Sequence, residues 1–287
     1  MRYWSVLFAA AAIFSVGAFL YAPFSPDWWL PNPSGNFHHV VSTYGAEIDN
    51  LFLIILIITG ITFVGTQVVL VWELHRFADK TDSEGKPLRK ADYFHGSQRL
   101  ELIWTIIPGA ILVFIALYQM GTWADIKYRS SAPRVPTLAE VTARQFQWVI
   151  RYPGADGRLN TLDDLVTIND LHFVKAGKPE QGSTGPAQKN MVLIYLKSSD
   201  VIHSFFLPQM RIKQDAVPGL TIPVWFDCDT AGQYELVCAE LCGWGHYKMR
   251  GKVTVHETQE EFQKWLDDSF AEQSRSQLSM ANGTQGR

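Results

Sequence analysis

The stretch CAELCGWGHYKM, from Cys238 to Met249, decides how the C-terminal half of this chain must fold. It holds two cysteines four residues apart, a histidine four residues later and a methionine three residues after that. The chain has 3 cysteines, and two of them lie here. Because thiolates and thioethers are soft metal ligands and imidazole is intermediate, the segment predicts a metal site built largely from one tight loop.

Zinc and copper are the two metals to weigh for this donor set. Zinc would use the two thiolates, the imidazole and a fourth ligand, but methionine suits copper better. A mononuclear blue-copper site needs one cysteine, two histidines and a methionine, which leaves one cysteine too many here. The second histidine must come from outside the loop, and the candidate is His203 in DVIHSFFLP. One ligand on an early strand and the rest in a late loop fits a β-barrel, where strand ends converge at one rim.

The surrounding residues 126–273 read as short β-rich runs separated by turn residues, which favours an antiparallel sandwich or barrel. The expected strands are AEVTARQFQWVIRY, MVLIYLK, HSFFLP, TIPVWFDC, QYELVC and GKVTVH. The polar insertion at Pro153–Asp164 does not match the spacing of the twelve-residue calcium loop, so we expect a solvated turn.

A helix is expected after the last strand. Thr258 and Glu261 form a capping-box pattern. The following apolar residues make one helix face that we expect to pack on the β domain, namely Phe262, Trp265, Leu266 and Phe270. Residues 274–287 are predicted to be a polar tail without regular structure.

The N-terminal half is apolar enough to enter a membrane. Leu51–Trp72 and Leu102–Trp123 each run for about 20 residues without a charge, which is the length that crosses a bilayer. They predict two transmembrane helices, at about 48–74 and 100–123. These two helices would form a hairpin within residues 23–125.

Residues 1–22 carry a further apolar segment behind Arg2. It is either a cleaved signal peptide or a retained signal anchor, that is, a third helix, and both interpretations remain open.

The charges predict orientation and exclude some functions. Basic residues gather in the loop 73–99, which marks it as cytoplasmic, so the β domain lies on the periplasmic or outer side of a bacterial plasma membrane or its equivalent. A net charge of −3 does not suggest a nucleic-acid binder. No Cys-x-x-Cys-His occurs, so no covalently attached haem is expected on this chain.

These motifs resemble subunit II of the haem-copper respiratory oxidases, the cytochrome c oxidase family. Cys-x-Glu-x-Cys-x-x-x-His-x-x-Met is that family's signature for CuA, a dinuclear copper centre. GAEIDNLFLIILIITG and RLELIWTIIPGAILVFIAL look like its two membrane helices. Over residues 40 to 270 the resemblance implies a membrane-anchored chain, with two transmembrane helices and a C-terminal cupredoxin-like all-β barrel.

The resemblance also implies a ligand set for two copper ions. It comprises two bridging thiolates, two capping imidazoles, a weak thioether ligand and a backbone carbonyl, from Cys238, Cys242, His203, His246, Met249 and Glu240. The carboxylate of Glu240 would point toward a magnesium site shared with subunit I.

The implied function is electron transfer within a proton-translocating respiratory complex. The copper pair takes electrons from cytochrome c and passes them to haem in subunit I, where oxygen is reduced to water. The implied partners are subunit I, other oxidase subunits, the cytochrome c donor and the lipid bilayer.

The family usually places a tryptophan where electrons enter from cytochrome c. In RQFQWVIRY that position is occupied by Phe146, and Trp148 follows two residues on, so period-two alternation puts both on one strand face. Either residue is an electron-accepting contact or an ordinary strand-core aromatic.

Two other positions resemble functional sites of the family. Glu101 matches a carboxylate near the mouth of a proton path into subunit I, although a solvated acid at a helix start is an equal alternative. Lys213 and Asp215, in RIKQDAVPGL, are read as subunit-interface residues.

Three alternative functions compete with this one. A subunit of a copper-containing nitric oxide reductase and a membrane-tethered cupredoxin electron carrier remain open, whereas a quinol oxidase subunit would lack copper ligands.

Cys228 is expected to be a buried strand residue rather than a ligand. The remaining histidines are expected near loops or membrane boundaries without partner spacing, namely His38, His39, His75, His95, His256 and, in the polar insertion, His172.

Overall fold

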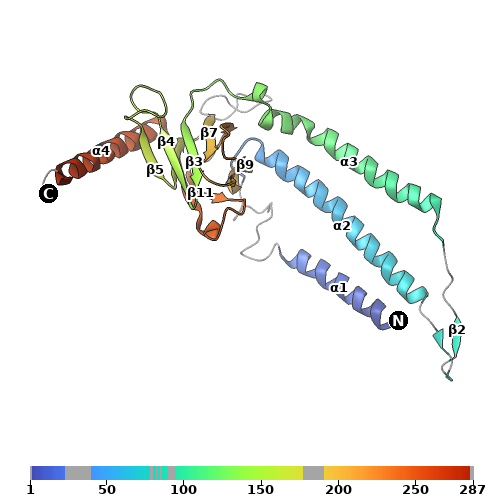
Figure 1. Cartoon of the computed structure of the whole chain (residues 1–287). Coiled ribbons are helices and arrows are strands. Elements are labelled where there is room, and N and C mark those ends of the chain that lie inside the picture. Colours follow the sequence, from blue (N-terminus) through green and yellow to red (C-terminus); the bar gives the residue numbers. More distant parts are fainter. Residues whose placement is uncertain are drawn as a thin grey trace. The chain divides into compact units, whose positions relative to one another are not determined.

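The computed structural model describes residues 2–22, 40–77, 80–81, 83–84, 86–89, 95–176 and 191–284. The chain divides into two compact units, coloured along the sequence in Figure 1. One unit contains the N-terminal helices up to Gly121, and the other contains Val40–Ala46 and everything from Thr122 onward.

Three helices in the described chain are long and apolar enough to cross a membrane. They are α1 (Arg2–Tyr21), α2 (Gly45–Arg76) and α3 (Gln98–Lys127). At 1.5 Å per residue the 32 residues of α2 and the 30 of α3 exceed the bilayer core. Both expected transmembrane helices are therefore present and extend beyond their predicted ends, while the signal peptide and the signal anchor both stay predictions for α1.

Polar groups inside α2 are satisfied within the helix itself. The hydroxyls of Thr59 and Thr62 each donate to the carbonyl four residues back, at 2.8 Å in both cases. Thr66 donates three residues back, at 2.9 Å. In a bilayer no water is available for these groups, so this pairing lets the helix carry hydroxyls through the apolar layer.

The connection between α2 and α3 contains a small hairpin. Its strands are β1 (Lys80–Thr81) and β2 (Pro87–Arg89), which pair antiparallel. After α3 comes a single 3-10 turn, η2 (Arg129–Ser131).

The C-terminal unit is built from two five-stranded sheets (Figure 1). The first has the order β10-β7-β3-β4-β5. Its strands are β3 (Ala139–Arg144), β4 (Gln147–Tyr152), β5 (Leu165–Ile168), β7 (Val192–Ser198) and β10 (Ile222–Phe226).

The second sheet has the order β6-β12-β11-β8-β9. Its strands are β6 (Asp170–Val174), β8 (His203–Leu207), β9 (Ile212–Ala216), β11 (Gly232–Cys238) and β12 (Arg250–His256). A 3-10 turn, η3 (Pro208–Met210), joins β8 to β9.

Alternating inward side chains fill the space between the sheets. On β4 every second residue is buried, namely Trp148, Ile150 and Tyr152. From the opposite sheet Phe205 meets Trp148 edge to face, with ring centroids 5.7 Å apart. Burying each such side chain contributes roughly 1.5–3 kcal/mol, so this core is what fixes the strand ends that carry the loops.

The expected all-antiparallel arrangement is wrong in two places. β3 pairs with β7 in parallel, and β12 pairs with β6 in parallel. A parallel pair needs a long crossover rather than a tight turn, so sequence-adjacent strands end up in different sheets. The strands β5, β6 and β9 were not predicted, because each is only 4 or 5 residues long, and polar residues also interrupt the apolar pattern of β6 and β9.

The expected single strand over AEVTARQFQWVIRY is a hairpin instead. β3 ends at Arg144, Gln145 and Phe146 form the turn, and β4 begins at Gln147. Phe146 and Trp148 therefore do not share one strand face, because Phe146 belongs to the turn.

The segment at Pro153–Asp164 is a turn-rich loop, as expected. Its carboxylates are satisfied by the loop itself: Asp164 accepts from the backbone N–H groups of Asn160 at 2.7 Å and Thr161 at 3.2 Å. Asp163 accepts from the Thr161 hydroxyl at 2.7 Å.

The last helix, α4 (Gln259–Thr284), begins as predicted. Thr258 accepts a hydrogen bond from the N–H of Glu261 at 3.3 Å, and Phe262 is buried against the core. The prediction of a tail without regular structure from Ser274 is wrong over the described residues, because α4 continues to Thr284. Before Gly283 this stretch contains no glycine or proline. Gln273 also anchors the helix by donating to Asp164 O at 2.8 Å.

The short segment before α2 packs on the β domain. Thr43 N–H donates to Asp227 at 3.0 Å, and Ser42 donates to Met210 O at 2.7 Å. Val41 is buried in the same core as the strands. The C-terminal unit therefore includes residues 40–46, which the sequence had assigned to the helical part.

Candidate metal centre

The loop CAELCGWGHYKM connects two neighbouring strands. Cys238 is the last residue of β11, and Met249 directly precedes β12. The N–H of Cys238 donates to Met249 O at 3.1 Å, which closes the base of the loop. Within it, η4 (His246–Lys248) turns the chain back toward the strand ends. Donor residues that are eleven positions apart are thereby brought to one rim of the sheet.

The loop supplies four of the predicted donor side chains, and the fifth, that of His203, comes from the strand beside the loop. His203 is the first residue of β8, and β8 pairs with β11 through Cys238 and Phe205. The N–H of Ala239 extends the pairing to Ser204 O at 3.0 Å. His203 is completely buried, so its ring must meet the loop.

The donor atoms form one compact cluster. The two thiol sulfurs, Sγ of Cys238 and of Cys242, lie 3.8 Å apart. Nδ1 of His203 lies 3.9 Å from Cys238 Sγ, and Nδ1 of His246 lies 3.7 Å from Cys242 Sγ. Each sulfur therefore has one imidazole nitrogen beside it.

Two further donors lie on either side of the sulfur pair. Met249 is buried, and its Sδ lies 3.8 Å from Cys242 Sγ. The backbone oxygen of Glu240 lies 3.3 Å from Cys238 Sγ. The structure thus brings together all six residues that the sequence proposed as ligands.

The donor chemistry fits a soft metal ion. At 3.8 Å the two sulfurs are far beyond the disulfide bond length of about 2.05 Å. Burial, and next the neighbouring thiol of Cys238, raise the pKa of Cys242 to about 11. Two buried thiols this close become a pair of good ligands once a metal replaces their protons. Of the described residues, His203, Cys238 and Cys242 form a group with donor atoms within 4.8 Å of one another.

Asp200 orients the imidazole of His203, and sequence reasoning missed it. His203 Nε2 lies 2.7 Å from Asp200 Oδ1, which fixes Nδ1 as the nitrogen facing the sulfurs. Burial alone would raise the pKa of Asp200, but hydrogen bonds from Gln145 N–H and His203 hold that pKa below its usual range. At metal sites the second ring nitrogen of a ligating histidine commonly contacts a carboxylate. The acid three residues before His203 was therefore the sequence signal that could have identified Asp200.

Three loops meet over the cluster. Gln145, in the β3–β4 turn, donates through its N–H to Asp200 at 2.6 Å and through its side chain to Cys242 O at 2.6 Å. The next residue, Phe146, is half-buried, and its ring is 5.2 Å from that of Trp244. The β3–β4 turn is therefore attached to both ligand-bearing loops.

Trp148 is not a surface residue. It is completely buried, with its ring 6.3 Å from His203 and 5.7 Å from Phe205. The prediction of Trp148 as a contact for an electron donor is wrong, because a donor cannot touch it. Trp148 is a core residue that supports the back of His203.

The other proposed site residues are not members of the donor cluster. Glu101 is exposed in the first turn of α3. Lys213 and Asp215 are exposed on β9, an edge strand of the second sheet.

Cys228 is buried, as predicted, but it lies two residues beyond the end of β10 and not on a strand. Its thiol lies 3.2 Å from Thr230 O, and burial raises its pKa to about 12. It takes no part in the cluster described above.

Two histidines were misplaced by the sequence reasoning. His172 lies on β6 rather than in the polar insertion, is buried, and stacks on Trp265 of α4 with ring centroids 3.7 Å apart. Its Nδ1 lies 2.9 Å from Nε2 of His256, which ends β12. The pair attaches α4 to the sheet, and its spacing in sequence is too long to suggest this. His38 and His39 lie outside the described residues.

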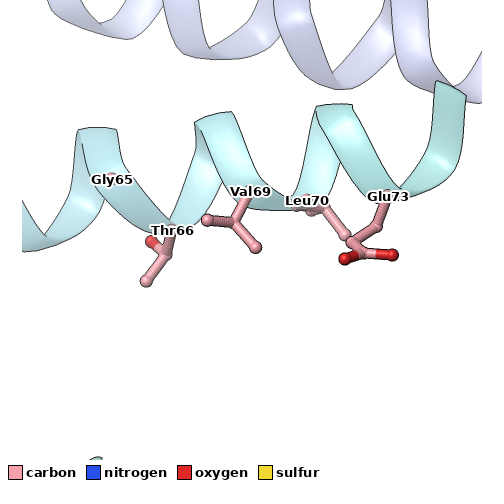
Figure 2. A pocket seen from close by; sticks show the side chains of 5 residues that line it. All are labelled: Gly65, Thr66, Val69, Leu70 and Glu73. Atoms are coloured by element: carbon pink, nitrogen blue, oxygen red, sulfur yellow. The ribbon is translucent and has the colours of Figure 1, made fainter. Parts of the chain in front are cut away.

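A shallow open groove lies on α2 and carries no such chemistry. It is lined by Gly65, Thr66, Val69, Leu70 and Glu73 (Figure 2). Its lining is almost entirely apolar and comes from a single membrane-spanning helix. A face with small residues of this kind is typical of helix packing in membranes, not of a catalytic site.

Comparison with known proteins gives the family. Residues 140–255 match the family described as "Cytochrome C oxidase subunit II, periplasmic domain". Residues 32–121 match the family described as "Cytochrome C oxidase subunit II, transmembrane domain". The two matches follow one another along the chain, the transmembrane domain first and the periplasmic domain second.

Full-length relatives agree with these matches. The chain is 31% identical to the alternative cytochrome c oxidase subunit 2 of Bradyrhizobium diazoefficiens, across 89% of this chain and 88% of that relative. It is 27% identical to cytochrome c oxidase subunit 2 of Thermostichus vulcanus, across 83% and 80%. Among solved structures it resembles the periplasmic domain of subunit II of cytochrome oxidase of Bradyrhizobium japonicum. That likeness has 25% identity, covers 49% of this chain and 97% of the other, and gives a TM-score of 0.37.

The helices and the donor cluster define a membrane-anchored protein with a soft-metal site in a cupredoxin-like β domain. Together with its relatives, this chain belongs to the cytochrome c oxidase subunit II family. It is the subunit of a haem-copper respiratory oxidase that accepts electrons from cytochrome c, with its β domain on the outer side of the membrane. The family match favours this function over the nitric oxide reductase and the tethered electron carrier.

Proposed function

We propose that the donor cluster is the CuA centre of this oxidase subunit and holds two copper ions. The proposed ligands are Cys238, Cys242, His203, His246, Met249 and the carbonyl of Glu240. The observation that carries the proposal is the pairing of each sulfur with its own imidazole nitrogen, at 3.9 and 3.7 Å, around two sulfurs 3.8 Å apart. A single-copper site would leave the second thiolate without a use.

When bound, the copper pair accepts one electron from cytochrome c and delivers it to haem in subunit I. The chain's own contribution is to hold the donors rigidly. His203 is fixed by Asp200, the loop base is closed between Cys238 and Met249, and the cysteines are almost excluded from solvent. A donor set that does not move on electron transfer keeps the reorganisation small.

The test is copper analysis and electron paramagnetic resonance on the intact oxidase that contains this chain. We expect two coppers per β domain and a spectrum in which one unpaired electron couples to two copper nuclei. Cys238→Ser and Cys242→Ser should each abolish that spectrum, whereas Cys228→Ser, the matched control, should leave it intact. A spectrum with one copper nucleus would disprove the dinuclear assignment.

We also propose that Glu240 reaches a magnesium ion shared with subunit I. Its side chain is exposed, while its carbonyl lies in the cluster at 3.3 Å from Cys238 Sγ. Carboxylates suit magnesium, which binds few protein ligands and keeps several waters. Replacing magnesium with manganese in the intact oxidase should give a manganese resonance that Glu240→Gln weakens.

Two further roles are proposed for exposed residues. Glu101 is proposed to lie at the start of a proton path into subunit I, because a carboxylate at a membrane boundary is a frequent proton carrier. Lys213 and Asp215 are proposed to contact other oxidase subunits, because they are exposed on an edge strand. Phe146 is proposed to lie on the path by which electrons enter from cytochrome c.

A further inference from the structure

Trp244 is the most exposed large aromatic of the ligand loop. It stands between the two ligands Cys242 and His246, two residues from each, and 81% of its surface is accessible. Exposed tryptophans are costly in water, and they are the residue type most often found at the centre of binding interfaces.

The side chain of Trp244 covers Phe146. The two rings meet at a centroid distance of 5.2 Å and an angle of 65°. Glycines on both sides of Trp244 permit this contact: a Cβ at Gly245 would lie 2.5 Å from the Phe146 ring, and one at Gly243 would lie 3.2 Å from it. The loop backbone therefore lies directly against Phe146, and Trp244 extends beyond it.

The same loop presents two more large apolar side chains to solvent. Leu241 is 78% exposed and Tyr247 is 68% exposed. With Trp244 they place three large apolar side chains within seven residues of the ligand loop. A concentration of this kind on a soluble domain marks an interaction surface.

We propose that Trp244 is the residue that the cytochrome c donor touches, with Phe146 as its support. The inference rests on the proposed copper site and specifies where its electron arrives. The haem iron of the donor is oxidised from the ferrous to the ferric state, and the copper pair gains that one electron. No bond is made or broken and no proton is transferred. Trp244 supplies the contact area that holds the donor close enough for the transfer.

Two other aromatics are poorer candidates for this contact. Trp148 has no accessible surface. Phe146 is half-buried and is in ring contact with Trp244, so a donor that reached it would first meet the tryptophan. The occupant is a c-type cytochrome because that is the electron donor of this family of oxidases, and because the patch adjoins the proposed ligands themselves.

The experiment uses the intact oxidase carrying Trp244→Ala, Trp244→Phe or the control Leu162→Ala. Leu162 is fully exposed in the loop after β4, at the opposite end of that strand from the ligand loop. Two quantities are measured. The first is the second-order rate of copper reduction by reduced mitochondrial cytochrome c. The second is the affinity for zinc-substituted cytochrome c, which has no iron to give up an electron and therefore reports binding alone. Electron paramagnetic resonance checks that each variant keeps its copper spectrum.

We expect Trp244→Ala to lower both the rate and the affinity by about tenfold or more, as loss of an interface hot spot does. Trp244→Phe should recover most of the loss, and Leu162→Ala should change neither quantity. Reduction by hexaammineruthenium(II), which needs no protein contact, should be the same in all variants.

The outcomes separate the inference from the proposed function. If Trp244→Ala keeps its copper spectrum and behaves as the unaltered oxidase in both measurements, the inference is wrong. If Phe146→Leu slows reduction while Trp244→Ala does not, the contact lies at Phe146. If the unaltered oxidase contains no copper pair, or holds one that takes no electron from reduced cytochrome c, the proposed function itself fails.

Discussion

Asp200 shows how one residue outside the ligand set can control the site. Its carboxylate holds His203 Nε2 at 2.7 Å, so its negative charge adds to the electron density of the ligating ring. We expect Asp200→Asn to keep the copper pair but to raise its reduction potential and weaken copper affinity by about 10- to 100-fold. Potentiometric titration of the intact oxidase checks this. The matched control is Asp229→Asn, which removes an exposed carboxylate from another loop. Equal potentials for Asp200→Asn and the unaltered chain would contradict the role assigned to Asp200.

Glu101 is a second residue whose role can be decided by removing one charge. If protons enter subunit I there, Glu101→Gln should slow oxygen consumption by about tenfold or more, since a positioned proton carrier contributes at least that much. Glu73→Gln is the control, because Glu73 is also an exposed acid near a helix end at the same loop. Copper reduction by the donor should be unaffected in both variants. Normal turnover in Glu101→Gln would leave the residue as an ordinary helix-start acid favoured by the helix dipole.

At the residue scale the proposed ligands could be predicted, but their supports could not. The soft donors stand within twelve residues and need a second histidine, and the place of His203 at the head of a strand-like run made it the candidate. Asp200, Gln145 and the two glycines act through contacts between distant loops. The local sequence does not indicate such contacts, because each of these residue types is also common in ordinary turns and on ordinary surfaces.

At the scale of elements, the hairpin at residues 139–152 shows where pattern reasoning fails. The turn at Gln145 and Phe146 has no glycine, proline or asparagine to announce it. It is held instead by Asp200, by the Cys242 carbonyl and by the loop backbone under Phe146. The β-prone run at residues 139–152 therefore predicts one strand, and the predicted shared face of Phe146 and Trp148 was wrong as a consequence.

The attachment of α4 to the sheet should depend on pH through His256. Burial, with the adjacent His172 as the next cause, lowers the pKa of His256 below its ordinary value of 6.5, while Glu261 of α4 opposes this. Asp170 also faces the pair, since its Oδ1 lies 3.0 Å from His172 Nε2, although the two atoms are not aligned for a hydrogen bond. A detached helix would leave His256 with its ordinary pKa, so the detached state binds more protons. The attachment is therefore strongest above pH 6.5 and weakens as the pH falls through 6.5.

Hydrogen exchange on the intact oxidase measures this effect. Amides of α4 should exchange faster at about pH 5.5 than at about pH 7.5, after correction for the intrinsic rates, because His256 of the detached helix, with its ordinary pKa of 6.5, gains its proton between them. His256→Gln should remove most of the difference, since glutamine does not titrate. A variant that keeps the full pH dependence would show that another group is responsible.

At the scale of the whole molecule, composition and periodicity predicted the division into membrane helices and a β domain. Long uncharged apolar runs have few alternatives to a membrane span, and short alternating strands have few alternatives to a sandwich. The parallel pairings and the inclusion of residues 40–46 in the β unit could not be predicted. Both depend on which distant segments meet, such as Thr43 with Asp227, and hydrophobic pattern alone does not specify partners.

The donor cluster should also stabilise the whole β domain when loaded. A metal that binds only the folded state adds about 4 kcal/mol at a thousandfold excess over its dissociation constant. For a domain of this size that shift corresponds to roughly 10 °C in the unfolding temperature. Removing copper by chelation should therefore lower the temperature at which the β domain of the full chain becomes sensitive to protease.

Cys242→Ser should unfold at the lower temperature with or without copper, because one of the two thiolates is gone. Cys228→Ser should retain the copper-dependent shift, since its sulfur faces Thr230 O and not the cluster. A β domain equally stable with and without copper would mean that the cluster is held by the fold alone and that metal loading contributes nothing to stability.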